Sequence, residues 1–171
     1  FRMMRSRSDL HFVFFTKRIE RLSAFLPDDW EAGYDNVTIG CTCEDQIRAD
    51  MRLPLFLALP IRRRWIVAEP LLTPLSLLPY LTAADAPIAQ VTVGGESGEQ
   101  ARLCEYDWVL SIREQCLSAG VPFSYHQTGA RLKKDGREYR IPRKLQQIQA
   151  KKAGLDTLSD AMDSSDDARR L

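Results

Sequence analysis

Five short apolar runs rich in β-forming residues recur along this 171-residue chain, and they constrain its fold more than any other feature. They lie at 11–16, 37–42, 65–68, 89–93 and 122–125. Continuous apolar runs of this length are typical of buried strands in a parallel sheet. Amphipathic stretches at 18–26, 45–59 and 107–119 predict helices between them. Pro54 predicts a kink or break in the second helix, and Gly120 predicts the end of the third.

A polar residue follows each predicted strand, and successive ones are 27, 25, 27 and 31 residues apart. This spacing fits one β/α unit each and predicts an α/β fold with a parallel sheet. Such residues form the catalytic face of a barrel, although strand ends are also polar simply because they lead into loops. A doubly wound sheet uses the same ends of its strands. The five residues are Lys17, Glu44, Glu69, Glu96 and Gln127. We expect a partial, TIM-like β/α barrel of about five parallel strands.

The sequence pattern changes after Gln127. Asp135-Gly136 between alternating flanks predicts a hairpin over 131–141, and a helix is expected over 144–153. The acidic, serine-rich sequence from Asp156 onward predicts disorder. We therefore expect the partial barrel over 1–129, a basic hairpin and helix extension over 130–153, and an acidic disordered tail over 154–171.

Several strand-end residues have chemistry suited to a ligand. Glu69 could act as an acid, a base or a hydrogen-bond acceptor, and Lys17 could bind a carboxylate or phosphate. Glycines after a strand let the backbone approach a ligand and can expose amides to an anion, but they also permit a tight strand exit. Catalytic residues stay unassigned. The candidate ligand-binding residues are Lys17, Glu44, Glu69, Gly94, Gly95, Glu96 and Gln127.

The cysteines and histidines do not form a metal-binding pattern. No CxxC pair or clustered spacing occurs, so buried, reduced thiols and no metal site are expected. His126 precedes Gln127 and could face the site, but a lone histidine is more often a local hydrogen-bonding residue. The four cysteines are Cys41, Cys43, Cys104 and Cys116.

The charge of the chain is unevenly distributed. The net charge is only +1, yet residues 131–152 hold nine Lys or Arg against two acidic residues. This segment could contact nucleic-acid phosphates, or it could be a solvated hairpin face. The basic residues in question are Arg131, Lys133, Lys134, Arg137 and Arg140.

No apolar run is long enough for a membrane span, and the start lacks the apolar region of a signal peptide. A cytoplasmic location is therefore expected. Because the first residue is Phe1, we also expect the sequence to begin partway into a longer product.

Between about residues 9 and 129, the chain resembles a phage-associated family of unknown function that carries a three-cysteine motif. The matching stretches are 15–21, 36–40, 44–46, 69–72, 93–98, 101–102, 107–109, 111–116, 120–123 and 127–129. The family is similar to radical S-adenosylmethionine barrels. The resemblance implies an iron–sulfur cluster held by cysteines near the N-terminus, with S-adenosylmethionine beside it. It departs at His126 and Thr128, where the family has another basic residue and an aromatic one.

This chain lacks the cysteine cluster that the resemblance requires. It is therefore interpreted as the C-terminal part of such an enzyme, with no cofactor of its own and without radical chemistry as it stands. S-adenosylmethionine and the cluster would belong to a longer protein. One alternative is a non-enzymatic nucleic-acid or protein binding module of phage or mobile-element origin. Another is a gene remnant that exposes the edge of its sheet and self-associates.

Overall fold

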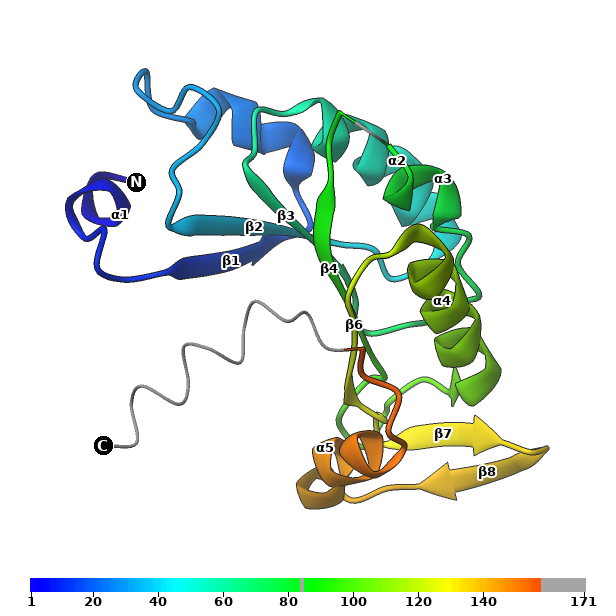
Figure 1. Ribbon diagram of the computed structural model, residues 1–171. Coiled ribbons are helices and arrows are strands. Elements are labelled where there is room, and N and C mark those ends of the chain that lie inside the picture. Colours follow the sequence, from blue (N-terminus) through cyan, green and yellow to red (C-terminus); the bar gives the residue numbers. More distant parts are fainter. Residues whose placement is uncertain (84, 158–171) are drawn as a thin grey trace.

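The computed structural model describes residues 1–83 and 85–157 of the chain (Figure 1). Most of the acidic tail expected over 154–171 therefore lies outside the described residues. The order of elements confirms the expected alternation of strands and helices, with an additional short helix, α1 (Arg2–Ser6), at the start.

The main sheet has five strands, and all of its pairings are parallel. Their order in the sheet follows their order in the chain: β1 (Phe12–Thr16), β2 (Val37–Thr42), β3 (Arg63–Ala68), β4 (Ile88–Gly94) and β6 (Phe123–Gln127). A doubly wound sheet would reverse its strand order partway, whereas successive strands of a barrel are neighbours. The topology confirms the α/β fold and matches consecutive strands of a barrel.

The helices between the strands lie on one side of this sheet (Figure 1). They are α2 (Gln46–Ala58), α3 (Leu78–Leu81) and α4 (Tyr106–Ala119), with a 3₁₀ helix, η1 (Ile19–Phe25), after β1. In the wall of a barrel, the helical connections between successive strands also all lie on one side of the sheet. The predicted helix over 18–26 is thus a 3₁₀ helix, and the Pro-rich segment 71–81 contains only one short helical turn.

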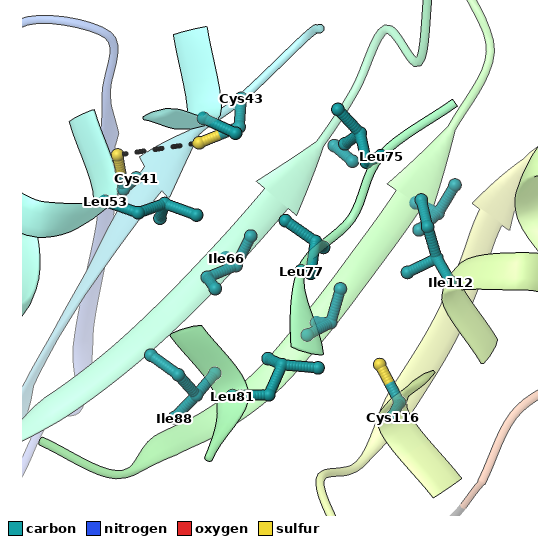
Figure 2. Close-up of a cluster of buried hydrophobic side chains, with 14 of the residues drawn as sticks. Cys41, Cys43, Leu53, Ile66, Leu75, Leu77, Leu81, Ile88, Ile112 and Cys116 are labelled. Atoms are coloured by element: carbon teal, nitrogen blue, oxygen red, sulfur yellow. Dashed lines mark hydrogen bonds between the residues drawn. The ribbon is translucent and has the colours of Figure 1, made fainter. Parts of the chain in front are cut away.

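The core fills the space between the sheet and these helices (Figure 2). Because side chains alternate along a strand, Ile39 and Cys41 of β2 share the face that α2 covers with Leu53. Farther along, Ile66 and Ile112 join the same buried cluster. These side chains are fully buried, so the helix-facing side of the sheet provides the hydrophobic stabilisation of the fold.

Of the kink or break predicted at Pro54, the break does not occur, because helix α2 runs through this residue. Pro54 is exposed, while Leu53 and Phe56 beside it are completely buried. Burial of the apolar stripe outweighs the backbone hydrogen bond that proline cannot make. At the other predicted stop, Gly120 has φ 66° and its amide bonds the end of α4, which confirms its role as a helix terminator.

A second sheet lies next to the C-terminal end of the main one. It joins β5 (Cys104–Glu105), which the sequence did not predict, to the expected hairpin of β7 (Arg131–Lys134) and β8 (Arg137–Arg140). The turn residues Asp135 and Gly136 both have positive φ, as a two-residue type I′ turn requires. Helix α5 (Arg143–Lys152) packs against β6. The domain boundaries at 129/130 and 153/154 stay predictions.

Candidate functional site

The strand-end residues lie along the carboxyl edge, the edge of the main sheet where Thr16, Thr42, Ala68, Gly94 and Gln127 end their strands. The parallel pairing brings these ends together although they are far apart in sequence. The carboxyl edge of an open or closed parallel sheet is where ligands bind in α/β proteins.

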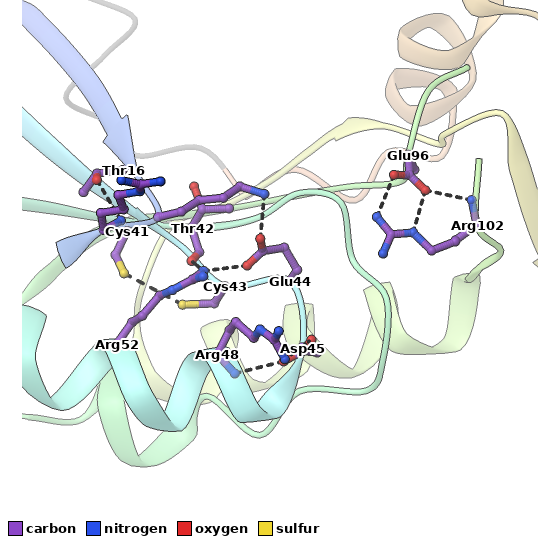
Figure 3. Close-up of polar contacts among 12 residues, drawn as sticks. Thr16, Cys41, Thr42, Cys43, Glu44, Asp45, Arg48, Arg52, Glu96 and Arg102 are labelled. Carbon is purple, nitrogen blue, oxygen red and sulfur yellow. Dashed lines mark hydrogen bonds and ion pairs between the residues drawn. The ribbon is translucent and has the colours of Figure 1, made fainter. Parts of the chain in front are cut away.

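Glu44 is bonded to two cations (Figure 3). Its two carboxylate oxygens accept hydrogen bonds from Lys17 Nζ and Arg52 Nη1, each at 2.6 Å. Burial alone would raise the pKa of Glu44, but the bonds from Lys17 and Arg52 outweigh it and hold the pKa below its usual value. An ionised carboxylate with both oxygens occupied is suited to position Lys17 rather than to transfer a proton.

Glu69 joins β3 to the end of β6. Its carboxylate lies 2.9 Å from His126 Nδ1 and also accepts a hydrogen bond from the side-chain amide of Gln127. The second ring nitrogen, His126 Nε2, lies 3.2 Å from the side-chain amide nitrogen of Gln147. An amide nitrogen can only donate, so Nε2 is the acceptor and Nδ1 carries the proton given to Glu69. Glu69 thereby fixes the tautomer and orientation of the imidazole.

Gly94 and Gly95 allow β4 to leave the sheet in close contact with its neighbours. A Cβ on Gly94 would lie 2.6 Å from the carboxyl carbon of Glu69, and one on Gly95 would collide with the carbonyl oxygen of Thr128. The Gly95 amide already donates to the carbonyl of Gln127 at 3.0 Å. The glycines therefore bring the exit of β4 against Glu69 and against the turn after β6.

Glu96 lies beyond this exit and binds Arg102 (Figure 3). Its carboxylate accepts from Arg102 Nε at 2.8 Å, from Nη2 at 2.7 Å and from the Arg102 backbone amide at 2.8 Å. These bonds lower the pKa of Glu96 to about 2, and the charge of Lys17 adds to the effect. Glu96 is thus ionised and held by a bidentate ion pair, the strong geometry for arginine and a carboxylate.

The structure joins the predicted residues in two groups: Lys17 contacts Glu44, and Glu69 contacts Gln127 and lies against Gly94. Glu96 contacts Arg102, which was not predicted. Reasoning from the sequence missed Arg52, Arg102 and Gln147, which are partners of the predicted residues. Of these, only Arg52 carried a usable signal, because a cation on α2 can reach back to a residue just before that helix.

The cysteines are all free and buried, as expected. Cys41 Sγ lies 4.0 Å from Cys43 Sγ, and burial raises the pKa of both Cys104 and Cys116 to about 12. Protonated thiols are poor metal ligands. Within residues 1–83 and 85–157, no group of three or more His, Cys, Asp or Glu side chains could hold a metal ion. An iron–sulfur cluster therefore does not fit the described residues.

The basic segment is partly neutralised by acidic neighbours. Arg131 pairs with Glu138 at 2.8 Å, and Lys133 lies 3.2 Å from Glu105 of β5. The ammonium of Lys134 lies over the ring of Tyr106, 4.7 Å from its centroid. Strand β8, which carries Arg137 and Arg140, is exposed along its whole length.

Fold and site together define an α/β protein of barrel-type winding with a polar, ion-paired carboxyl edge. Residues 1–164 match the model of a family described as protein of unknown function (DUF5131), and the chain belongs to this family. Comparison with curated proteins and with solved structures gave no match. No helix among the described residues has the length and apolar character needed to cross a membrane.

Proposed function

We propose that the carboxyl edge is the ligand-binding face of a radical S-adenosylmethionine-type enzyme of phage origin, and that S-adenosylmethionine is the ligand. One observation carries the proposal: the ends of five consecutive parallel strands gather ionised and hydrogen-bonding side chains on one edge. The sequence resemblance supplies the class of enzyme. The iron–sulfur cluster of that class would have to be held by residues outside the described part of the chain.

The residues of this edge are chemically suited to S-adenosylmethionine. The ligand carries an ammonium and a sulfonium, which carboxylates attract, and a carboxylate, which a cation attracts. Glu69 is the carboxylate of the edge that lies beside an imidazole, and Lys17 is an exposed cation held in place by Glu44. When bound, S-adenosylmethionine would supply the reactive methyl or adenosyl group. The role of this chain is to bind and orient it.

Binding of S-adenosylmethionine measured by isothermal titration calorimetry tests the proposal. Glu69→Gln and Glu96→Gln should each weaken binding about tenfold, because each removes a charged hydrogen-bonding group. Glu138→Gln is the matched control, since Glu138 is also paired with an arginine but lies on the hairpin. Its affinity should stay within about twofold of the unaltered chain.

Two results would contradict the proposal. One is the absence of S-adenosylmethionine binding to the unaltered chain. The other is unfolding of Glu69→Gln and Glu96→Gln, detected by circular dichroism, which would give these carboxylates a structural role.

A second candidate function is a non-enzymatic binding module that contacts nucleic acid through the hairpin. It is favoured by the full exposure of β8, which presents Arg137 and Arg140 to solvent. An electrophoretic mobility shift with duplex DNA would support it if the affinity fell steeply between 50 and 200 mM salt, roughly the range in which phosphate contacts are lost. No shift at low salt would exclude it.

A further inference from the structure

A cavity of about 520 Å³ lies between the hairpin, helix α5 and the start of α4. Its volume falls within the roughly 300–1,000 Å³ range of small-molecule sites. Leu132 and Lys134 of β7 and Tyr139 of β8 line one side, and Tyr139 is 44% exposed. Leu132 is paired directly with Tyr139 in the register of the hairpin, so the two share a face.

The cavity is separate from the carboxyl edge described above. Tyr125 lines the cavity, whereas its neighbour His126 contacts Glu69. The candidate side chains of the carboxyl edge, such as Glu69, Glu96 and Gln127, are not among the residues that line the cavity. A nucleotide site here therefore does not depend on the proposed function.

Tyr125 has a buried hydroxyl without a partner. The side chain is 2% exposed, and its hydroxyl makes no hydrogen bond within the described part of the chain. Buried polar groups are nearly always satisfied by protein, water or a ligand. Burial, together with Cys104 and Tyr106, raises the pKa of Tyr125, so the hydroxyl keeps its proton and can donate. An acceptor atom of a bound molecule would satisfy it.

Among the described residues, the charged side chains that line the cavity are all positive. They are Lys134, Arg140 and Lys152. Of the other hairpin cations, Arg131 binds Glu138 and Lys133 binds Glu105, and Arg137 lies exposed on β8 outside the cavity lining. The cations of the hairpin that line the cavity therefore complement an anion.

The remaining lining suits a flat, aromatic body. The rings of Tyr106 and Tyr125 lie 6.3 Å apart at 56°, and Tyr139 adds a third ring. Lys134 already lies over one of these rings, which places a cation beside the aromatic surface. Stacking rings, adjacent cations and a buried donor are together the elements that bind a base with its phosphate.

We propose that this cavity binds a nucleotide, with the base against Tyr106 and Tyr139 and the phosphate near Lys134 and Arg140. Two sources share this chemistry. One is a free mononucleotide, and the other is an unpaired nucleotide of a single strand. The hydroxyl of Tyr125 is the internal donor that a polar atom of the ligand satisfies.

Fluorescence polarisation with two probes tests this site: fluorescently labelled AMP and a labelled single-stranded oligonucleotide of about ten nucleotides, a length within the usual site size of single-strand binders. Arg140→Gln should weaken binding about tenfold, because it removes a charged hydrogen bond. Arg137→Gln is the matched control, since it removes the same charge from the same strand outside the cavity lining. Its affinity should stay within about twofold.

Tyr125→Phe separates a ligand-binding role from a structural one. Removing an unsatisfied hydroxyl should leave the unfolding midpoint of the free protein unchanged or higher. The same variant should weaken nucleotide binding about fivefold to tenfold, since a ligand hydrogen bond is lost. A lower midpoint with unchanged binding would overturn the assignment of the hydroxyl to the ligand.

The probes also identify the source of the nucleotide. Comparable binding of both probes indicates a free nucleotide, and binding of the oligonucleotide alone indicates an unpaired strand. Failure of both probes to bind at about 1 mM, the weak limit of useful affinity, would overturn the proposal. Equal weakening by Arg137→Gln and Arg140→Gln would also overturn it, because the attraction would then be diffuse.

Discussion

Glu44 and Glu96 are both ionised at the carboxyl edge, but their surroundings differ. Glu44 is enclosed by two cations, with 14% of its side chain exposed, whereas Glu96 lies 27% exposed beside the much more exposed Arg102. The first carboxylate links β1, β2 and α2, and the second links only the two ends of one loop. Glu96 is therefore the residue whose charge can be removed with the least disturbance of the fold.

Removing the charge of Glu96 should change how stability depends on pH. Its pKa is about 2 in the folded protein and near the ordinary glutamate value of 4.5 when unfolded. The ion pair thus stabilises the fold above about pH 4.5, and this contribution is lost as pH falls towards 2. At pH 7, the free energy of unfolding of Glu96→Gln should be lower than that of the unaltered chain by at most about 1 kcal/mol, because the pair is partly exposed.

Urea unfolding at pH 7 and at pH 2.5 measures this effect. The difference between Glu96→Gln and the unaltered chain should shrink at the lower pH. Glu99→Gln, which removes an exposed charge three residues away, controls for overall charge. A difference that is equal at both pH values would show that Glu96 does not stabilise the fold through its charge.

At the scale of elements, α2 ends without glycine because an arginine satisfies its last carbonyls. The guanidinium of Arg64 in β3 reaches the carbonyl oxygens of Phe56 at 3.5 Å, Leu57 at 3.4 Å and Leu59 at 2.7 Å. Its side chain is buried, and burial lowers the pKa of the guanidinium. A cation at a helix C-terminus also complements the helix dipole.

Arg64→Met should therefore destabilise the fold by about 1–3 kcal/mol, because buried carbonyls lose their donor. The neighbouring Arg63→Met is the matched control, since Arg63 is exposed and lies on the same strand. Guanidinium-chloride unfolding of both variants measures the difference. Equal stability of the two variants would contradict the capping role.

Sequence patterns predicted the elements that have a clear period. The runs behind β1, β2, β3, β4 and β6, the stripes of α2 and α4, and the Asp135-Gly136 hairpin were all confirmed. The two-residue strand β5 is too short to have a period. Over seven residues, the period of the 3₁₀ helix η1 is too close to that of an α-helix for the sequence pattern to separate them. Continuity of α2 through Pro54 depends on tertiary burial, which no local rule contains.

Less of the candidate site than of the fold could be predicted from the sequence. Counting along the chain located the strand-end residues, because parallel strands place their carboxyl ends together. The partners of those residues could not be predicted in the same way. Arg102 reaches Glu96 through a loop, and Gln147 reaches His126 from α5, so only the folded arrangement joins them.

At the scale of the whole molecule, helices cover one face of the main sheet. On the other face, the outer strand β1 has apolar side chains that the described residues leave exposed, Val13 at 43% and Phe15 at 52%. A complete barrel would pack its interior with side chains. The described residues thus have the form of part of a barrel wall, with β1 and β6 as the outer strands of the sheet.

Hydrogen exchange with mass spectrometry, with and without S-adenosylmethionine, is the most direct test of the carboxyl edge as the ligand-binding face. Ligand binding should slow exchange in peptides from four separate strand ends, those that span 43–46, 69–72, 94–97 and 127–129. Peptides of η1 and of the amino ends of the strands should not change. No change at the carboxyl edge, or protection confined to the opposite end of the sheet, would contradict binding of S-adenosylmethionine at this edge.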